Sequence, residues 1–242
     1  MGSLLIELDK SNFTPKMLGS LELWLDASDL STITESSGAV SQWDDKSGNS
    51  NNATQGTGTN QPTTGSDTLN NKNTLTFDGS NDYLSISDFS SILDIAANFT
   101  VFFAFRWNGT VSTSRTLTAS TVSTSNRFVA TINTNGHLIV GTYNGSSYNT
   151  KTLAVSADTS TRIFSITHTS ADVISAWLNG SEITGATETP ATSNNSGTTI
   201  GARTFGDSNF DDYLAEVIIY SRILSASERT KVENYLSNKW GA

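Results

Sequence analysis

The feature of this sequence that most constrains its fold is a regular series of short segments with strand-like composition. In the second half of the chain they read RFVATIN, HLIVGTY, TRIFSIT, DVISAWLNG, TTIGAR and YLAEVIIYS. They recur roughly every ten residues and are separated by turn sequences such as Asn-Gly. The segment 99–107 (FTVFFAFRW) is apolar at almost every position, as in a strand buried on both faces. This series predicts an antiparallel, layered all-β domain without βαβ units.

The rest of the sequence predicts one domain. A chain of 242 residues lies within the range of a single large β-sandwich, and no linker or exact repeat divides it. Residues 1–18 are predicted to form an N-terminal arm, because a few apolar residues are followed by Pro15 and Gly19 as breakers. Residues 19–242 are predicted to form the sandwich.

Three segments depart from the strand pattern. Residues 46–73 contain almost no apolar side chain and predict a long surface loop, either functional or poorly ordered. Residues 90–96 (SSILDIA) have the apolar spacing of one or two helical turns. One convincing helix comes last: the SASE sequence at 225–228 is a capping box, and Val232 and Leu236 follow on one face.

Composition excludes several classes of function. The net charge is -9 and the 14 Lys and Arg residues are scattered singly, so we expect no nucleic-acid partner. No apolar run reaches membrane-spanning length, and the N-terminus has no basic region of a signal peptide; we therefore expect a soluble chain with no membrane partner. The absence of cysteine excludes disulfides and cysteine-based metal sites.

Six segments resemble, in this order, the concanavalin A-like lectin/glucanase superfamily. They are LELWLDASDLSTI, VSQWDDKSGNSNNATQ, LTFDGSNDYLSI, FTVFFAFRW, SAWLNG and the C-terminal stretch that begins at TIGAR. The similarity covers about residues 19–242. It is strongest to the laminin G-like (LamG) domains of bacterial secreted proteins and phage structural proteins. The resemblance implies an antiparallel two-sheet jelly-roll sandwich with a ligand face or loop rim, and often one structural calcium ion.

The sequence departs from the catalytic members of that superfamily. Their glucanases carry a Glu-x-Asp-x-x-Glu strand, because a retaining glycosidase needs two carboxyl groups about 5 Å apart. Glu7 and Asp9 have the first spacing, but Asn12 stands where the second glutamate belongs. His137 and His168 have no nearby sequence partner that would mark a general base. We expect no enzyme activity; a glycoside hydrolase or lyase with a non-standard site is the remaining alternative.

Calcium binding is the cofactor that the sequence allows. Calcium takes six to eight oxygen ligands, which loops rich in Asp, Asn and Gly supply. The stretches WDDKSGN and FDGSND are such loops. A glutamate inside the apolar strand LAEVIIY must either face solvent or pair with a cation. The candidate calcium ligands are Asp44, Asp45, Asp78, Asp82 and Glu216. The alternative for each loop is a turn whose carboxylate caps backbone N–H groups.

Glycan binding is the function that the aromatic residues allow. Sugar rings stack on aromatic faces flanked by polar side chains. The candidate glycan-binding residues, in or beside loops rich in Gly and Asn, are Tyr143, Tyr148, Phe205, Phe210 and Tyr213. The tryptophans lie in apolar contexts and are assigned to packing: Trp24, Trp43, Trp107, Trp177 and Trp240.

These expectations favour a non-catalytic sandwich that binds a glycan, such as a host-surface polysaccharide, or builds a surface. The likeness to phage proteins and the missing catalytic motif favour a bacteriophage virion component, such as a tail, fibre or capsid-surface protein. The arm would then bind other virion proteins, and a homo-oligomer would be compatible. The alternative is a carbohydrate-binding module of a secreted bacterial protein, located outside the cell.

Overall fold

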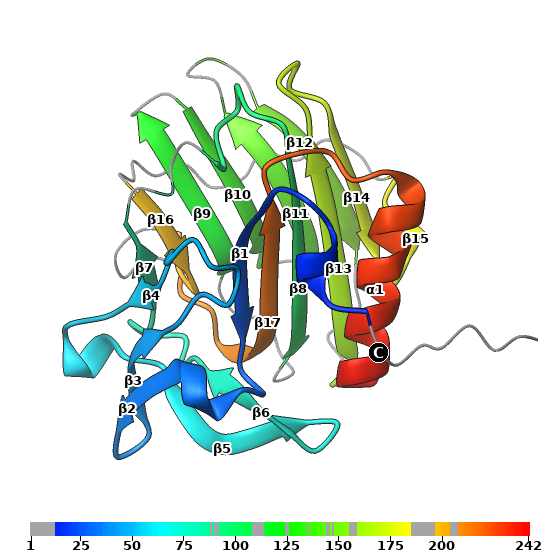
Figure 1. The fold of residues 1–242 in the computed structure, drawn as a ribbon. Helices are drawn as coiled ribbons and strands as arrows, with labels where there is room; N and C mark the ends of the chain where they lie inside the picture. The colour runs from blue at the N-terminus through cyan, green and yellow to red at the C-terminus, as the bar shows by residue number, and fades with distance from the viewer. Residues whose placement is uncertain are drawn as a thin grey trace, which may run out of the picture.

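The structure, a computed structural model, describes most of the chain. The described residues are 13–87, 89, 92–107, 114–123, 126–134, 136–143, 146, 148–154, 159–184, 197–203 and 208–242, with the backbone alone at 121–123, 126–127, 148 and 197. The 17 strands found in these residues are hydrogen-bonded in one continuous antiparallel sheet. This sheet folds into two packed layers (Figure 1). The predicted all-β, antiparallel two-sheet jelly roll is confirmed.

The front layer in Figure 1 is built around the apolar segment 99–107. In order across the layer its strands are β15 (Ser181–Glu182), β14 (Ile174–Leu178), β13 (Thr161–His168), β8 (Phe99–Trp107), β17 (Asp212–Tyr220) and β1 (Leu21–Asp26). Strand β8 lies between β13 and β17, and both of its faces are covered. This central position explains its nearly continuous apolar sequence.

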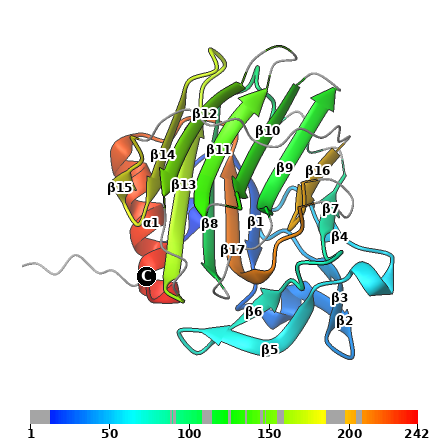
Figure 2. The ribbon, with the colours of Figure 1, turned by 180° about the vertical axis from the view of Figure 1, so that it is seen from behind.

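The back layer faces the viewer in Figure 2. Its strands, in order, are β12 (Tyr148–Ala154), β11 (His137–Tyr143), β10 (Asn126–Ile132), β9 (Arg115–Ser123), β16 (Gly197–Ile200), β7 (Leu84–Ile86), β4 (Ala53–Thr54), β3 (Ala39–Trp43) and β2 (Ile33–Ser36). Two more strands, β5 (Thr63–Leu69) and β6 (Lys72–Thr76), pair with β3 and β17 and so join the layers.

The alternation of β8 side chains creates two hydrophobic cores. Phe103 and Phe105 point between the layers, where they pack with residues of the back layer. Phe102 and Ala104 point to the outer side of the front layer, into a second core. All four side chains are fully buried. The burial of each phenylalanine contributes about 2–3 kcal/mol, so β8 stabilises both cores.

Helix α1 (Ala226–Trp240) covers the second core and follows the sequence prediction closely. Its N-cap Ser225 accepts a hydrogen bond from the backbone N–H of Glu228, so the capping box is formed. Val232 and Leu236 are buried against the outer face of the front layer. The helix ends at Gly241, whose φ of 76° is the left-handed conformation that glycine adopts without strain.

The predicted N-terminal arm is only partly described. Residues 1–12 lie outside the described residues, so their role as an attachment element stays a prediction. The short 3-10 helix η1 (Pro15–Met17) packs on the domain: Pro15 is buried, and its carbonyl accepts a hydrogen bond from Tyr220 at 3.0 Å. Phe13 meets the ring of Tyr235 edge-on. Phe13 and the 3-10 helix η1 therefore pack on the sandwich.

Two local predictions need correction. The stretch 46–73 contains β4, β5, the 3-10 helix η3 (Gly58–Asn60) and the start of β6, so it is not a plain loop. Its strands are short and mostly solvent-facing, which is why no apolar pattern marked them. The described residues after 91 in the run 90–96 form turns and no helix; Asp94 there accepts a hydrogen bond from the N–H of Ala96. A further 3-10 helix, η2 (Leu30–Thr32), follows β1.

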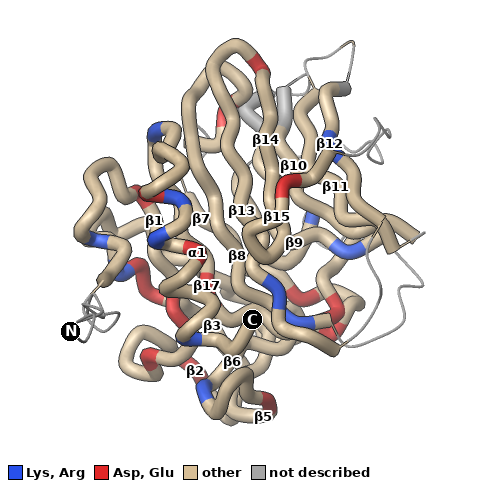
Figure 3. The backbone as a smooth tube through the Cα atoms, turned by 90° about the vertical axis from the view of Figure 1, so that its right-hand side faces the viewer, with Lys and Arg blue, Asp and Glu red and all other residues tan. Residues whose placement is uncertain are grey.

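Two further expectations concern the surface. In Figure 3, Lys and Arg are interspersed with Asp and Glu on the side that carries α1, and no basic stripe appears there. None of the helices in the described part of the chain has the length and apolar character needed to cross a membrane.

Candidate functional site

The stretch WDDKSGN forms a tight turn held by its own carboxylates. Asp45 accepts hydrogen bonds from the backbone N–H groups of Trp24 at 2.9 Å, Ser47 at 2.8 Å and Asn51 at 3.1 Å. Asp44 accepts a hydrogen bond from the side chain of Gln42 at 2.6 Å. The structure therefore gives Asp45 the backbone-capping role that was the alternative to calcium binding, whereas Asp44 contacts a side-chain amide.

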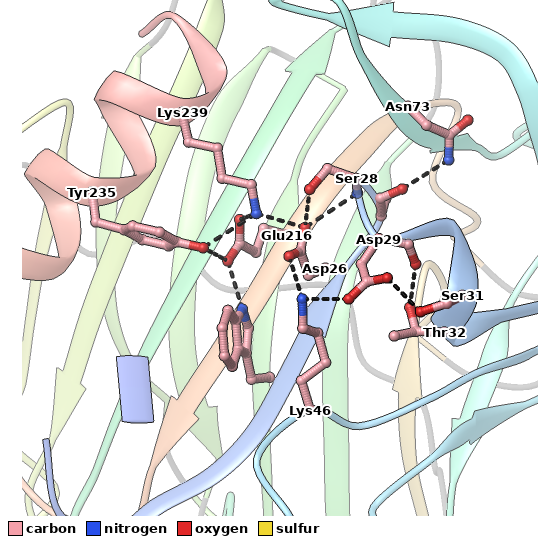
Figure 4. Close-up of polar contacts among 12 residues, drawn as sticks. Asp26, Ser28, Asp29, Ser31, Thr32, Lys46, Asn73, Glu216, Tyr235 and Lys239 are labelled. Atoms are coloured by element: carbon pink, nitrogen blue, oxygen red, sulfur yellow. Dashed lines mark hydrogen bonds and ion pairs between the residues drawn. The ribbon is translucent and has the colours of Figure 1, made fainter. Parts of the chain in front are cut away.

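The next residue of this turn, Lys46, enters a buried polar cluster between β1, β17 and α1. We call it the Glu216 cluster; its members are Asp26, Asp29, Lys46, Glu216, Tyr235 and Lys239 (Figure 4). Lys46 pairs with Asp26 at 2.9 Å and with Asp29 at 2.8 Å. Lys239 joins Asp26 at 2.6 Å to Glu216 at 2.8 Å. The cluster thereby ties the first strand to the last strand and to the end of the helix.

Glu216 has every hydrogen-bonding position of its carboxylate occupied. Its Oε1 accepts from the indole N–H of Trp24 at 2.6 Å and from the hydroxyl of Tyr235 at 2.9 Å. Its Oε2 accepts from the indole N–H of Trp240 at 2.7 Å and from the ammonium of Lys239. Glu216 is fully buried. Of the two expected environments for this residue, a cation partner is the correct one, and that cation is a lysine.

Burial and charge shift the titration of this cluster in opposite directions. Burial raises the pKa of Glu216, and Lys239 offsets only part of that effect. Burial acts in the same direction on Asp26, but the two lysines outweigh it and hold the pKa of Asp26 below its usual value. Burial, together with the neighbouring Glu216 carboxylate, raises the pKa of Tyr235. The cluster thus sets Asp26 and Glu216 against lysines, with Tyr235 as a neutral donor.

A carboxylate pair with opposed pKa shifts is also the pattern of a glycosidase acid and base. Asp26 and Glu216 are cross-strand neighbours on β1 and β17. Nevertheless, both are buried, and donors from the protein fill the carboxylate of Glu216. A substrate has no free oxygen to use there. The Glu216 cluster therefore has a structural role, in which it connects β1, β17 and α1.

The stretch FDGSND forms a different acidic environment. Asp78 accepts hydrogen bonds from the N–H groups of Ser80 at 2.8 Å and Asn81 at 3.2 Å. Asp82 is buried, and its one hydrogen bond within the described chain comes from the N–H of Asp78 at 3.0 Å. Burial and the Asp78 charge raise the pKa of Asp82 to about 7. No lysine or arginine of the described chain pairs with it.

Asn209 adds a third oxygen to this region. Its amide N–H donates to the carbonyl of Ser80, which lies between the two acids. Its Oδ1 is buried and has no hydrogen-bond partner among the described residues. Two carboxylates and one amide oxygen are the start of a hard-cation site, although calcium needs six to eight oxygens. Within the described residues, no group of three or more His, Cys, Asp or Glu side chains is placed to hold a metal.

The aromatic candidates for glycan binding fall into different environments. Phe210 is fully buried and packs edge-on against Phe77 and Phe105, so its ring offers no face to a sugar; a core role replaces the binding role. Phe205 lies outside the described residues. Tyr143 is half-buried at the end of β11, opposite the backbone of Tyr148 on β12.

Among the described candidates, Tyr213 has the surroundings best suited to contact with a sugar ring. It is half-buried at the start of β17, and the guanidinium of Arg106 lies 4.3 Å from its ring centroid. Arg106 also pairs with Asp67 at 3.4 Å. Tyr213 is the cross-strand neighbour of Arg106 on β8 and of Thr76 on β6. We call Asp67, Thr76, Arg106 and Tyr213 the Tyr213 patch. It lies on the outer face of the front layer, because Phe102 and Ala104 of the same β8 face belong to the second core.

The tryptophans and histidines behave as structural residues. Trp24, Trp43, Trp107 and Trp240 are buried, as predicted, and Trp177 is half-buried under the guanidinium of Arg229. His168 is buried on β13, where its ring stacks on Phe99 and one nitrogen faces the carbonyl of Ala97. Its other nitrogen faces the carboxylate of Asp172, a partner four positions away that the sequence analysis missed. His137 opens β11.

Sequence reasoning missed the partners of Glu216 and Tyr213. Trp24 and Lys239 stand 192 and 23 positions from Glu216, and Arg106 lies on a different strand from Tyr213. Only the charge inside LAEVIIY signalled that a cation had to be near.

The fold and these surfaces define a lectin-like jelly-roll sandwich. The sequence family Laminin_G_3, described as the concanavalin A-like lectin/glucanases superfamily, matches residues 78–228. The chain belongs to this family, which confirms the resemblance found in the sequence. A search of curated protein sequences found no match.

Solved structures similar to this chain include receptor-binding domains and a module of a bacterial enzyme. The botulinum neurotoxin serotype D/C binding domain is 16% identical with a TM-score of 0.59, and the match covers 92% of this chain and 53% of that one. A type C neurotoxin, whose cell entry depends on two ganglioside molecules, is 15% identical with a TM-score of 0.58. The match covers 90% of this chain and 51% of that one. The CBM40 of the Ruminococcus gnavus IT-sialidase is 12% identical with a TM-score of 0.50. The match covers 66% of this chain and 96% of that one. The chain spans about half the length of the neurotoxin domains. These similarities establish the fold.

Proposed function

We propose that this chain is a non-catalytic glycan-binding domain and that the Tyr213 patch contacts the glycan. The observation that carries the proposal is the combination of a half-buried tyrosine ring with a guanidinium and a carboxylate on an outer sheet face. Aromatic faces stack on sugar rings, and paired charged groups bind neighbouring hydroxyls. Membership of a lectin superfamily and the likeness to ganglioside-dependent and CBM40 proteins support the same class of ligand.

The experiment that tests this proposal is a glycan-array screen of the purified chain, with calcium and again with EDTA. Glycan binding should weaken roughly tenfold in Tyr213→Ala, while Tyr213→Phe, which keeps the ring, should retain it. Leu30→Ala, at an exposed position on η2, is the matched control. If no glycan binds in either condition, the proposed function is wrong. If Tyr213→Ala binds as the wild type does, the patch is the wrong site.

We also propose that calcium, if the domain uses it, binds at Asp78 and Asp82 rather than at Asp44, Asp45 or Glu216. The buried Asp82 carboxylate lacks a cation partner in the described chain, and the Oδ1 of Asn209 is unsatisfied nearby. A bound ion would supply the missing positive charge and order the loop. Isothermal titration with calcium chloride tests this, with Asp82→Asn as the variant that should lose the heat of binding.

The biological setting follows from where such a domain would act. We propose a bacteriophage virion protein, such as a tail, fibre or capsid-surface component, as the first setting, and a module of a secreted bacterial protein as the second. In the first, residues 1–18 would bind other virion proteins; in the second, the glycan alone would be the partner. Genes beside its own for capsid and tail proteins would support the first setting, and genes for hydrolases and export would support the second.

A further inference from the structure

A polar groove lies on the same outer sheet face, between helix α1 and the turn that joins β14 to β15. Its volume is about 180 Å³. Pockets for drug-sized ligands are roughly 300–1,000 Å³, so this one fits a single small ring. We call it the Glu233 groove. Its lining residues that carry the argument are Asn179, Gly180, Arg229, Thr230, Glu233 and Asn234.

Glu233 supplies a carboxylate oxygen that the protein leaves free. The side chain is nine-tenths buried, with a relative exposure of 7% for the residue. Its Oε1 accepts hydrogen bonds from the hydroxyl of Ser165, at 2.5 Å, and from the guanidinium of Arg229. No group in the described chain donates to its Oε2. A Cβ atom on Gly180 would stand 4.0 Å from Oε2, which places this oxygen across the groove from the turn.

The side chains that line the groove are positioned by contacts with one another and with Trp177. The guanidinium of Arg229 lies 3.9 Å from the ring centroid of Trp177 and pairs with Glu233. Asn179 accepts a hydrogen bond from the N–H of Ile163 at 2.8 Å, which fixes its side chain beside the groove. Because these groups are already ordered, a ligand would pay little to organise them.

The donors and acceptors of the groove select a neutral hydroxyl-rich ligand. Glu233 offers an ionic acceptor, Arg229 a cationic donor, and Thr230 and Asn234 contribute an exposed hydroxyl and amide. An anion would meet the carboxylate, and a metal ion would meet the guanidinium and find one carboxylate only. Sugar hydroxyls both donate and accept, so they can satisfy all four groups.

The groove is a neighbour of the Tyr213 patch along β13. Thr161 of β13 is the cross-strand neighbour of Arg106. Ile163, which lines the groove, follows two residues later, about 7 Å along the strand on the same face. Arg106 and Tyr213 lie one and two strands away from β13, at about 4.8 Å per strand, so about 12 Å separates Ile163 from Tyr213. Two rings of one oligosaccharide chain can therefore occupy patch and groove.

We propose that the Glu233 groove binds one neutral sugar ring of a glycan, another ring of which lies on the Tyr213 patch. This inference rests on the proposed function, and it assigns a second, separate contact to the ligand. It also predicts selectivity: the free carboxylate oxygen disfavours acidic sugars in this subsite.

The test is an NMR titration of the ¹⁵N-labelled chain with D-galactose, N-acetylglucosamine and, as the anionic probe, N-acetylneuraminic acid. The neutral sugars should shift the amide signals of Asn179, Gly180 and Asn234, and the anionic sugar should not. Asn234→Trp, which fills the groove from an exposed helix position, should weaken this binding about tenfold or more. Lys231→Trp, exposed on another face of the helix, is the matched control and should bind as the wild type does. Glu233→Gln keeps an acceptor for Ser165 and should weaken the neutral sugars without unfolding the domain.

Three results would overturn the inference. They are the absence of shifts at the groove with both neutral sugars, equal binding in Asn234→Trp and wild type, and preference for the anionic sugar. If array binding then persists and depends on Tyr213, the groove assignment fails while the proposed function stands. If the array is silent as well, the proposed function fails with it.

Discussion

Glu216 and Asp82 are both buried carboxylates in a chain with few charged side chains, yet the protein treats them in opposite ways. Glu216 receives two indole N–H groups, a tyrosine hydroxyl and a lysine ammonium. Asp82 receives a single backbone N–H and stands beside another acid. Ionising a buried carboxylate costs several kcal/mol unless donors or a cation compensate it. The charge of Glu216 is therefore compensated by groups of the protein itself, whereas the charge of Asp82 needs a proton or an added cation.

The largest expected effect tests whether the ammonium of Lys239 compensates the buried charge of Glu216. Lys239→Met keeps the aliphatic stem but removes the ammonium, which leaves a fully buried carboxylate without its cation. We expect the free energy of unfolding to fall by about 3–5 kcal/mol. Urea unfolding followed by tryptophan fluorescence measures it.

Lys231→Met, at an exposed position on the same helix, is the matched control and should change stability by less than about 0.5 kcal/mol. A loss below about 1 kcal/mol in Lys239→Met would mean that the indole and hydroxyl donors alone compensate Glu216.

The second prediction tests whether the charge of the buried Asp82 carboxylate lacks compensation. Its folded pKa of about 7 lies above the unfolded value near 3.8, so the folded state holds a proton that the unfolded state has lost between these pH values. Stability should therefore fall as pH rises from about 4 to about 7. Asp82→Asn removes this loss, so the variant should exceed the wild type by up to about 4 kcal/mol at pH 8 and match it at pH 4.

Thermal unfolding across this pH range in EDTA provides the measurement. Calcium should reverse the order at pH 8, because binding stabilises only the folded wild type. Ser80→Ala, in the same exposed turn, should show the wild-type pH dependence. Parallel pH profiles for wild type and Asp82→Asn would refute the view that this acid is uncompensated.

The third prediction divides the contributions within the Glu216 cluster. Tyr235→Phe removes one hydroxyl donor to Glu216 while Lys239, Trp24 and Trp240 remain. The cost should be about 1–2 kcal/mol, well below that of Lys239→Met, since one neutral hydrogen bond to a charged group is lost. Equilibrium unfolding of the two single variants and the double variant gives the coupling energy. A cost equal to that of the lysine variant would show that the hydroxyl is as important as the charge.

The contrast between these two acids also shows how far sequence could predict this protein. The buried strand 99–107, the strand cadence and the capping box at 225–228 are local patterns, and each was confirmed. The apolar position of Glu216 predicted that it needed a cation if it was buried. Which cation depends on the fold, since Lys239 approaches only after α1 has packed on the front layer. For the same reason, the sequence pattern predicted the same glycan-binding role for Tyr213 and Phe210. In the fold, Tyr213 is half-buried on β17, whereas Phe210, in the loop before β17, is fully buried.

The smallest expected effect compares the two ends of α1. Its C-terminal end is held by the buried Glu216 cluster, whereas its N-terminal end is held by an exposed cap in which Ser225 and Glu228 exchange hydrogen bonds. The hydrogen bonds from Arg222 and Ser225 lower the pKa of Glu228 to about 2. Ser225→Ala should cost about 1 kcal/mol, with Ser227→Ala as the exposed control. Hydrogen exchange should then rise in the first turn and stay unchanged near Trp240. If exchange rose along the whole helix instead, the cap and the cluster would form one cooperative unit, and the separation drawn between exposed and buried charges would not hold for this helix.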